Sequence, residues 1–289
     1  MYMHVISIIS TKGGEGKSTH AANLAGLCAD AGLKTLLIDA DYAQPTASSY
    51  YHLEYEAPCG LYELLMQTVD LNQPQQIISH TNIPNLDLIV SNDPHEQLKT
   101  AMMHAPDGRF RLRNLLQHSL FTGYDVGILD SQGARSIMLE LVMLASHTAL
   151  AMIKPVVPDV REFLRGTIPL MEGLLPYKDF GIALPPVKIL VNCMDYTKLA
   201  REALKAITQI VEEGTYSSAD IPVSMLTTQI FDLDVYKLGH SLSQPVHRLE
   251  YQTDRKTLPA AQSMCDLASE LFPEWKHLFD DVLVRGACA

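Results

Sequence analysis

The sequence predicts an α/β protein with a doubly wound, mostly parallel sheet flanked by helices. Three observations support this prediction. Short apolar runs rich in Val, Ile and Leu recur between turn residues, as in strands that are buried on both faces. Segments with helical spacing separate these runs, and this alternation is typical of βαβ units. A glycine-rich loop joins the first apolar run to the first helical segment.

The predicted elements follow one another along the chain. Strands are predicted at residues 5–9, 35–38, 86–90, 126–129, 148–153 and 187–191. Helices are predicted at residues 17–31, 60–69, 109–121, 136–145, 159–175, 198–213 and 257–271. Stretches with Pro and Gly at 57–60, 92–108 and 184–186 are predicted loops. No composition shift marks a linker, so residues 1–289 are predicted to form a single domain with C-terminal helices packed on it.

Composition restricts the class of protein. The 22 Lys and Arg against 33 Asp and Glu give a net charge of −11, which argues against a generally basic nucleic-acid-binding coat. No apolar run reaches the length of a membrane span, and the N-terminus lacks the basic region of a signal peptide. Five widely spaced cysteines without a C-x-x-C pair suit reduced thiols. These features predict a cytoplasmic protein.

The loop after the first strand has the features of a phosphate-binding loop. Its glycines allow backbone N–H groups to converge on phosphate oxygens at a helix N-terminus. Lys17 is placed to reach the β- and γ-phosphates, and the Ser18 hydroxyl to bind Mg²⁺. Thr11 replaces the first glycine of the usual G-x-x-x-x-G-K-[ST] pattern, and a second lysine, Lys12, follows it. The predicted nucleotide-binding residues here are Gly13, Gly14, Glu15, Gly16, Lys17, Ser18 and Thr19.

The K-G-G-x-G-K-[ST] pattern of residues 12–18 resembles the ParA/MinD family of deviant-Walker P-loop ATPases, and most of all its ParA branch. The resemblance implies ATP and Mg²⁺ as cofactors and a homodimer that closes on ATP binding. It implies that Lys12 contacts the phosphates bound to the partner subunit. It also implies that Lys12, Lys17 and Asp41 are catalytic residues. It also implies slow hydrolysis stimulated by a partner protein.

Carboxylates follow two predicted strands. Asp39 and Asp41 form a D-x-D-x-x-Q segment after the second strand, and Asp130 closes the strand at 126–129 in the manner of a Walker-B aspartate. By resemblance, Asp41 orients the attacking water, while Ser18, Asp39 and Asp130 hold or support Mg²⁺. Taken alone, the D-x-D pair also suits solvated residues of a loop.

Several positions carry weaker or divergent signals. By resemblance Asn192 recognises adenine, although an asparagine also commonly ends a strand. Ser131-Gln132-Gly133 departs from the family's D-x-P-P or D-x-P-G segment. Arg135 suits either a contact with nucleotide or a partner, or an exposed helix start. Glu15 is unusual in its loop position, and its side chain is predicted to turn outward, away from phosphate and toward Lys12 or a partner chain. Asp159 and Arg161 fall where family members contribute to a dimer interface.

DNA binding is an open expectation of the ParA resemblance. The segment 223–230 lacks the family's usual arginines. Three other groups of cations are candidates, although each equally suits a solvated face. They are Lys198, Arg201 and Lys205; Arg248, Arg255 and Lys256; and Arg109, Arg111 and Arg113. The C-terminal segment 274–285 contains paired aspartates rather than a basic face, which predicts no membrane binding and predicts that Trp275, Phe279 and Val282 pack on the domain.

Together these features predict a Mg²⁺-dependent ATPase that acts as a dimerisation switch in the partition of a plasmid, chromosome or mobile genetic element. Two alternatives stay open. One is an ATPase that positions a protein machine, such as a secretion or conjugation apparatus, without binding DNA. The other is a P-loop ligase or kinase that acts on a small molecule.

Overall fold

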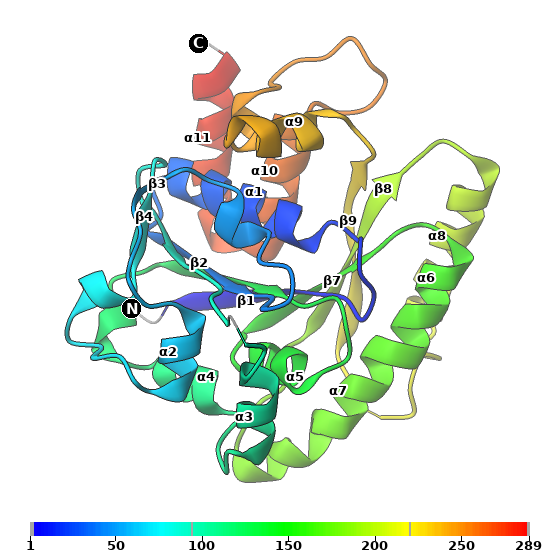
Figure 1. Ribbon diagram of the computed structural model, residues 1–289. Coiled ribbons are helices and arrows are strands. Elements are labelled where there is room, and N and C mark those ends of the chain that lie inside the picture. The colour runs from blue at the N-terminus through cyan, green and yellow to red at the C-terminus, as the bar shows by residue number, and fades with distance from the viewer. Residues whose placement is uncertain (1–2, 94, 220, 288–289) are drawn as a thin grey trace.

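A nine-stranded sheet forms the centre of the protein (Figure 1), here described from a computed structural model for residues 3–93, 95–219 and 221–287. The strand order is β3-β4-β5-β2-β6-β1-β7-β8-β9. The strands are β1 (His4–Ile9), β2 (Thr35–Ala40), β3 (Leu53–Tyr55), β4 (Ser79–Thr81), β5 (Leu86–Ile89), β6 (Val126–Ser131), β7 (Thr148–Ile153), β8 (Val187–Met194) and β9 (Val223–Phe231). All six predicted strands are present.

The sheet is parallel from β5 to β9 and antiparallel at the β3–β4–β5 edge. The central strand β1 pairs with β6 and β7, and Ile8 lies opposite Asp130. On β2, Asp39 also lies opposite Asp130. Because the carboxyl ends of parallel strands share one edge, the loops that follow β1, β2 and β6 meet there. The prediction of a doubly wound, mostly parallel sheet is therefore confirmed.

Helices cover both faces of the sheet (Figure 1). One face carries α1 (Lys17–Asp30), α9 (Val235–Leu242), α10 (Ala260–Leu271) and α11 (Lys276–Ala287). The other face carries α2 (Leu61–Met66), α3 (Leu98–His104), α4 (Arg111–Leu115), α5 (Ile137–Leu144), α6 (Val157–Glu162), α7 (Ile168–Leu174) and α8 (Lys198–Glu212). A π-helical turn, Phe163–Thr167, joins α6 to α7.

The apolar core has three parts, one on the first face and two on the second. Helix α1 is buried along nearly its whole length, between the sheet and the C-terminal helices. Phe279 and Val282 of α11 are buried against this layer and Trp275 packs on it, so the predicted packing of the C-terminal segment is confirmed. None of the helices in the described parts of the chain combines the length and apolar character that a transmembrane helix requires. Cys28, Cys59, Cys193 and Cys265 are free thiols.

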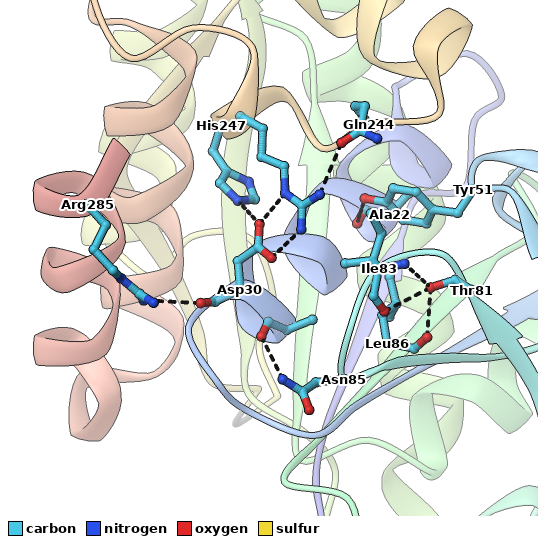
Figure 2. Close-up of polar contacts among 12 residues, drawn as sticks. Ala22, Asp30, Tyr51, Thr81, Ile83, Asn85, Leu86, Gln244, His247 and Arg285 are labelled. Carbon is cyan, nitrogen blue, oxygen red and sulfur yellow. Dashed lines mark hydrogen bonds and ion pairs between the residues drawn. The ribbon is translucent and has the colours of Figure 1, made fainter. Parts of the chain in front are cut away.

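An ionic network ties the end of α1 to the C-terminal third of the chain (Figure 2). The Asp30 carboxylate accepts hydrogen bonds from Arg248 Nε and Nη2 at 2.6 and 2.5 Å, and it lies 2.7 Å from His247 Nε2. Arg285 of α11 donates to the backbone oxygen of Asp30 at 3.2 Å. Gln244 accepts a further hydrogen bond from Arg248 at 3.2 Å. Through its carboxylate and its backbone oxygen, Asp30 therefore joins the end of α1 to the segment around Arg248 and to α11.

Candidate nucleotide-binding site

The loop between β1 and α1 depends on glycine at two positions. Gly14 and Gly16 have φ angles of 78° and 87°, in the left-handed region that other residues rarely adopt. At Gly16 a Cβ atom would also lie 2.6 Å from Asn192 Nδ2. Helix α1 begins directly after this turn, at Lys17. The loop thus combines a helix N-terminus with a backbone that carries no side chain where a phosphate would approach.

A cavity of about 480 Å³ lies over this loop. Its walls come from the loop, from the segment after β2 and from the segment after β6. The lining residues are Gly13, Gly14, Gly16, Lys17, Ser18, Thr19, Asp41, Ala43, Gln44, Thr46, Gln132, Gly133 and Ala134. The structure therefore brings together most of the predicted site residues, as the strand order requires.

Lys17 lies at the base of this cavity with only 6% of its surface exposed. Burial lowers the pKa of the Lys17 ammonium from its ordinary value, and the charges of Asp130 and Asp41 oppose that shift. Gly133, after β6, approaches so closely that a Cβ atom there would lie 2.9 Å from Lys17 Nζ and 2.8 Å from Gly13 Cα. Glycine is thus required at position 133 for the β6 loop to contact the phosphate loop, although the surrounding sequence departs from the family pattern.

Asp130 has the environment of a group that needs a cation. It is completely buried, and neither carboxylate oxygen has a hydrogen bond of standard geometry from the described residues; the Ser18 hydroxyl beside it and the charge of Lys17 only partly favour its charged form. Burial and the charge of nearby Asp39 raise the pKa of Asp130 well above its ordinary value. A divalent cation would remove this cost, and the oxygen donors Ser18 and Asp130 suit Mg²⁺, which prefers a few protein oxygens together with phosphate and water. The residues present therefore fit Mg²⁺.

The two carboxylates after β2 differ in their surroundings. Asp39 is buried, and its oxygens accept hydrogen bonds from Ser48 N and Oγ at 2.7 and 2.8 Å and from Asp41 N at 3.0 Å. Burial raises the pKa of Asp39 to about 6. Asp41 lines the cavity, and one of its oxygens accepts the N–H groups of Ala43 and Gln44 at 3.1 and 3.0 Å. Asp39 therefore fixes the backbone that presents Asp41 to the cavity, and its support of Mg²⁺ stays a prediction.

A second cavity of about 470 Å³ adjoins the first and shares Gly16, Thr19 and Thr46 with it. Its further lining includes aromatic and apolar side chains from the end of β9, from the loop that follows it and from α9, notably Phe231, Leu233 and Tyr236. The size and character of this cavity suit a purine base next to the phosphate site. These residues were not predicted, because no motif marks them and only the order of the strands brings them to the loop.

Asn192 lines the second cavity, but its amide is engaged within the chain. Its Nδ2 donates to the Glu15 backbone oxygen at 2.8 Å, and its Oδ1 lies 3.0 Å from His20 Nε2. Burial lowers the pKa of His20 to about 4, so this imidazole is neutral at physiological pH. Asn192 thereby fixes the phosphate loop from β8, and a direct contact with adenine stays a prediction. Arg135 is exposed just before α5 and does not line the nucleotide cavity, so a partner contact and an exposed helix start both stay predictions.

The second lysine of the loop points away from the cavity. Lys12 does not line it and instead forms an ion pair with Asp159, a buried residue of α6. Glu15 Oε1 lies 3.6 Å from Lys12 Nζ, and Glu15 is only 1% exposed. The Glu15 side chain therefore lies toward Lys12, as predicted, but it is buried beneath α6 rather than turned outward to the surface. Glu15 does turn away from phosphate, so only its backbone belongs to the nucleotide loop.

The surroundings of Glu15 lead to a pH-dependent prediction. Burial and the neighbouring Asp159 raise the pKa of Glu15 to about 6, against the opposing charges of Lys154 and Lys12. A raised pKa means that the folded protein binds the proton more tightly than the unfolded chain does. The stabilising contribution is then complete below about pH 4.5 and is lost as the pH rises through 6. We expect the Tm of Glu15→Gln, minus that of the wild type, to grow by roughly 2–4 °C between pH 5 and 7.5. Differential scanning fluorimetry measures this, with exposed Glu54→Gln as the control, and a constant difference would contradict the assignment.

The chain is similar to a described protein family and to curated relatives. A family model described as an AAA domain matches residues 3–158, more than half of the chain. The chain is 30% identical over 201 residues to the cell division protein PomZ of Myxococcus xanthus, a match that covers 69% of this chain and 60% of PomZ. It spans between 47% and 60% of the length of the first curated relatives that it matches.

Solved structures share the whole fold. The structure of apo McdA from Cyanothece superimposes with a TM-score of 0.69 at 20% identity, covering 97% of this chain and 98% of McdA. A plasmid partition protein of Borrelia burgdorferi bound to AMPPNP gives a TM-score of 0.66 at 20% identity, covering 95% of this chain and 99% of that one. Other structures with this fold contain ATP or Mg-ADP.

Proposed function

Because the chain belongs to the ParA/MinD family of P-loop ATPases, we propose that it is a Mg²⁺-dependent ATPase whose ATP-bound form is a homodimer. We propose that this switch serves the partition of a plasmid, chromosome or mobile genetic element, and that a partner protein stimulates its slow hydrolysis. The observation that carries the dimer is the position of Lys12. It lies outside the nucleotide cavity of its own chain, so its ammonium can serve the phosphates of a second subunit once it leaves Asp159.

The cavity residues have distinct parts in this proposal. The loop amides and Lys17 hold the β- and γ-phosphates in line with the attacking water. Asp41, whose carboxylate is fixed by two backbone N–H groups, orients that water. Ser18 and Asp130 hold Mg²⁺, which neutralises phosphate charge when it is bound. Closing the dimer requires Lys12 to leave Asp159 for the phosphates of the partner, where it stabilises the charge that develops during transfer.

Measuring the oligomeric state and the rate of ATP hydrolysis separately tests this function. We expect the wild type to elute as a monomer without nucleotide, to form a dimer with Mg-ATP, and to return to a monomer as ATP is consumed. Asp41→Ala should retain ATP and remain dimeric, with turnover lowered on the order of 10²-fold because the water is no longer oriented. Size-exclusion chromatography with light scattering, alongside phosphate release, measures both. A wild type that stays monomeric with Mg-ATP would refute the switch.

The structure separates the three candidate groups of DNA-binding cations. Most arginines of two groups are neutralised within the chain. The ion pairs are Arg109–Glu140, Arg111–Asp107, Arg248–Asp30 and Arg255–Glu250. On α8, by contrast, Arg201 and Lys205 are exposed without an ion pair to the described residues, and Lys198 has only an exposed pair with Glu202 at 3.6 Å. We therefore propose α8 as the face that binds DNA without sequence preference.

Removing the three α8 cations tests the DNA proposal. Lys198→Gln, Arg201→Gln and Lys205→Gln, combined, should weaken binding of the ATP-bound protein to a random duplex by about tenfold or more and should lower the salt dependence. Fluorescence anisotropy at several salt concentrations measures both quantities. The control removes three exposed lysines elsewhere, at Lys34, Lys99 and Lys276. Equal losses in the two variants would point to net charge rather than to α8. A wild type that dimerises with ATP but binds no DNA would favour the positioning of a protein machine.

A further inference from the structure

A third cavity of about 670 Å³ opens at the edge of the sheet opposite the nucleotide. It lies where β1, β7 and β8 begin, whereas the phosphate loop lies where β1 ends. The lining residues are Met3, Val5, Arg113, Leu116, Gln117, Leu144, Ala145, Ser146, His147, Ala183, Leu184, Pro185 and Pro186. The cavity shares no residue with the nucleotide cavities and contains no carboxylate, although the chain has 33 acidic residues.

Arg113 is the charged group of this cavity, and it has no partner within the described parts of the chain. It is partly buried, yet it forms neither an ion pair nor a hydrogen bond with the described residues. Its neighbours in sequence are different: Arg109 pairs with Glu140 at 2.6 Å, and Arg111 pairs with Asp107. Partial burial of a guanidinium without an anion is unfavourable. The planar N–H donors of the guanidinium match a carboxylate, which they can bind in a bidentate manner.

His147 also lines this cavity, and it is exposed. Its Nδ1 accepts the Val5 backbone N–H at 2.9 Å, so a neutral ring carries its proton on Nε2. Burial and the charge of Arg113 lower the pKa of His147, which keeps the ring neutral at physiological pH. The remaining hydrogen-bonding atom of this imidazole is therefore an N–H donor, in keeping with an acceptor as the ligand.

The other walls of the cavity indicate the chemical character and size of the rest of the ligand. Leu116, Leu144, Leu184 and the Pro185–Pro186 pair are apolar, and the volume falls within the range of small-molecule sites. We propose that this cavity binds a small carboxylate-bearing ligand, with its carboxylate on Arg113 and His147 and its apolar body against the leucine and proline walls. This site is independent of the proposed ATPase function.

Calorimetric titration with three monocarboxylates, hexanoate, 3-phenylpropionate and indole-3-acetate, tests the site. We expect at least one to bind the wild type, and its neutral amide to bind about tenfold more weakly. Arg113→Gln should weaken binding by about the same factor, while Arg109→Gln, which removes a charge from the same segment outside the cavity, should not. Ala183→Trp, at an exposed position of the rim, should block binding with Arg113 intact.

Thermal melts establish that each variant is folded before titration. Failure of all three acids to bind at millimolar concentration, equal binding of acid and amide, or unchanged binding by Arg113→Gln would each overturn the proposal. Since none of these titrations contains ATP, their failure would leave the proposed ATPase untouched.

Discussion

Replacing Lys17 by glutamine is expected to abolish ATP turnover. The Lys17 ammonium is a buried cation of the nucleotide cavity, and the charges of Asp130 and Asp41 favour its charged form. Without it, those carboxylates face the triphosphate with less compensating charge, and the phosphates lose a contact that strengthens as charge develops during transfer. We expect turnover to fall on the order of 10²–10³-fold and nucleotide affinity to fall with it. Phosphate release and the fluorescence of a labelled ATP analogue measure the two quantities.

Lys12→Gln is the matched control, since it removes the other lysine of the same loop. Lys12 lies outside the cavity, so this variant should bind nucleotide as a monomer with nearly the wild-type affinity and fail to form the ATP-dependent dimer. The two lysines are thereby distinguished by separate measurements. Wild-type nucleotide affinity in Lys17→Gln would contradict the placement of the phosphates over this loop.

The central part of the fold and the core of the site were predictable because both depend on local patterns. Continuous runs of Val, Ile and Leu predict strands that are buried on both faces, and all six such runs are parallel strands. Once those strands lie side by side, Asp39 and Asp130 must meet the phosphate loop at the shared carboxyl edge. The glycines and Lys17 follow from the chemistry of phosphate binding.

The edges of the sheet were not predictable from the same patterns. Strands β3 and β4 have three residues each and lack an apolar run, so only their pairing defines them, β3 with β4 and β4 with β5. Helix α3 lies within the predicted loop 92–108, and the predicted helix 109–121 contains only the short α4 followed by a 3₁₀ turn at Ser119–Phe121. In these segments, contacts with the rest of the domain outweigh local preference.

Side-chain surroundings were the least predictable feature of the site. A glutamate in a phosphate loop suggests an exposed group, yet Glu15 is buried because α6 brings Asp159 over the loop and holds Lys12 there. The cation groups on α8 and around Arg248 also look similar in the sequence, but they differ in whether their side chains form ion pairs. Arg248 is committed to Asp30, whereas Arg201 is not paired with any described residue. Such pairings join residues more than 100 positions apart, and no local pattern encodes them.

The second large effect is expected at Asp30, far from the nucleotide. Asp30→Ala leaves the buried His247 and the partly buried Arg248 without their shared carboxylate and loosens the attachment of α1 to the C-terminal segments (Figure 2). Removing one member of such a pair leaves the other charge partly buried without a counter-charge, so we expect a loss of about 3 kcal/mol in the free energy of unfolding at pH 7. Urea titrations followed by circular dichroism measure this loss. Arg285→Ala, which removes only an exposed hydrogen bond to the Asp30 backbone oxygen, is the control and should cost less than about 1 kcal/mol.

The pKa of the Asp30 carboxylate determines how this loss in the free energy of unfolding depends on pH. Burial acts to raise the pKa of Asp30, but the hydrogen bonds from Arg248 and His247 outweigh it and lower the pKa to about 2. A lowered pKa means that the stabilising contribution is present above the ordinary value of 3.8 and is lost as the pH falls toward 2. The stability difference between the wild type and Asp30→Ala should therefore be largest near pH 7 and should shrink between pH 4 and 2. If the difference is equally large at both ends of that range, the ion pair is not the source of the stability, and packing of the Asp30 side chain must account for it instead.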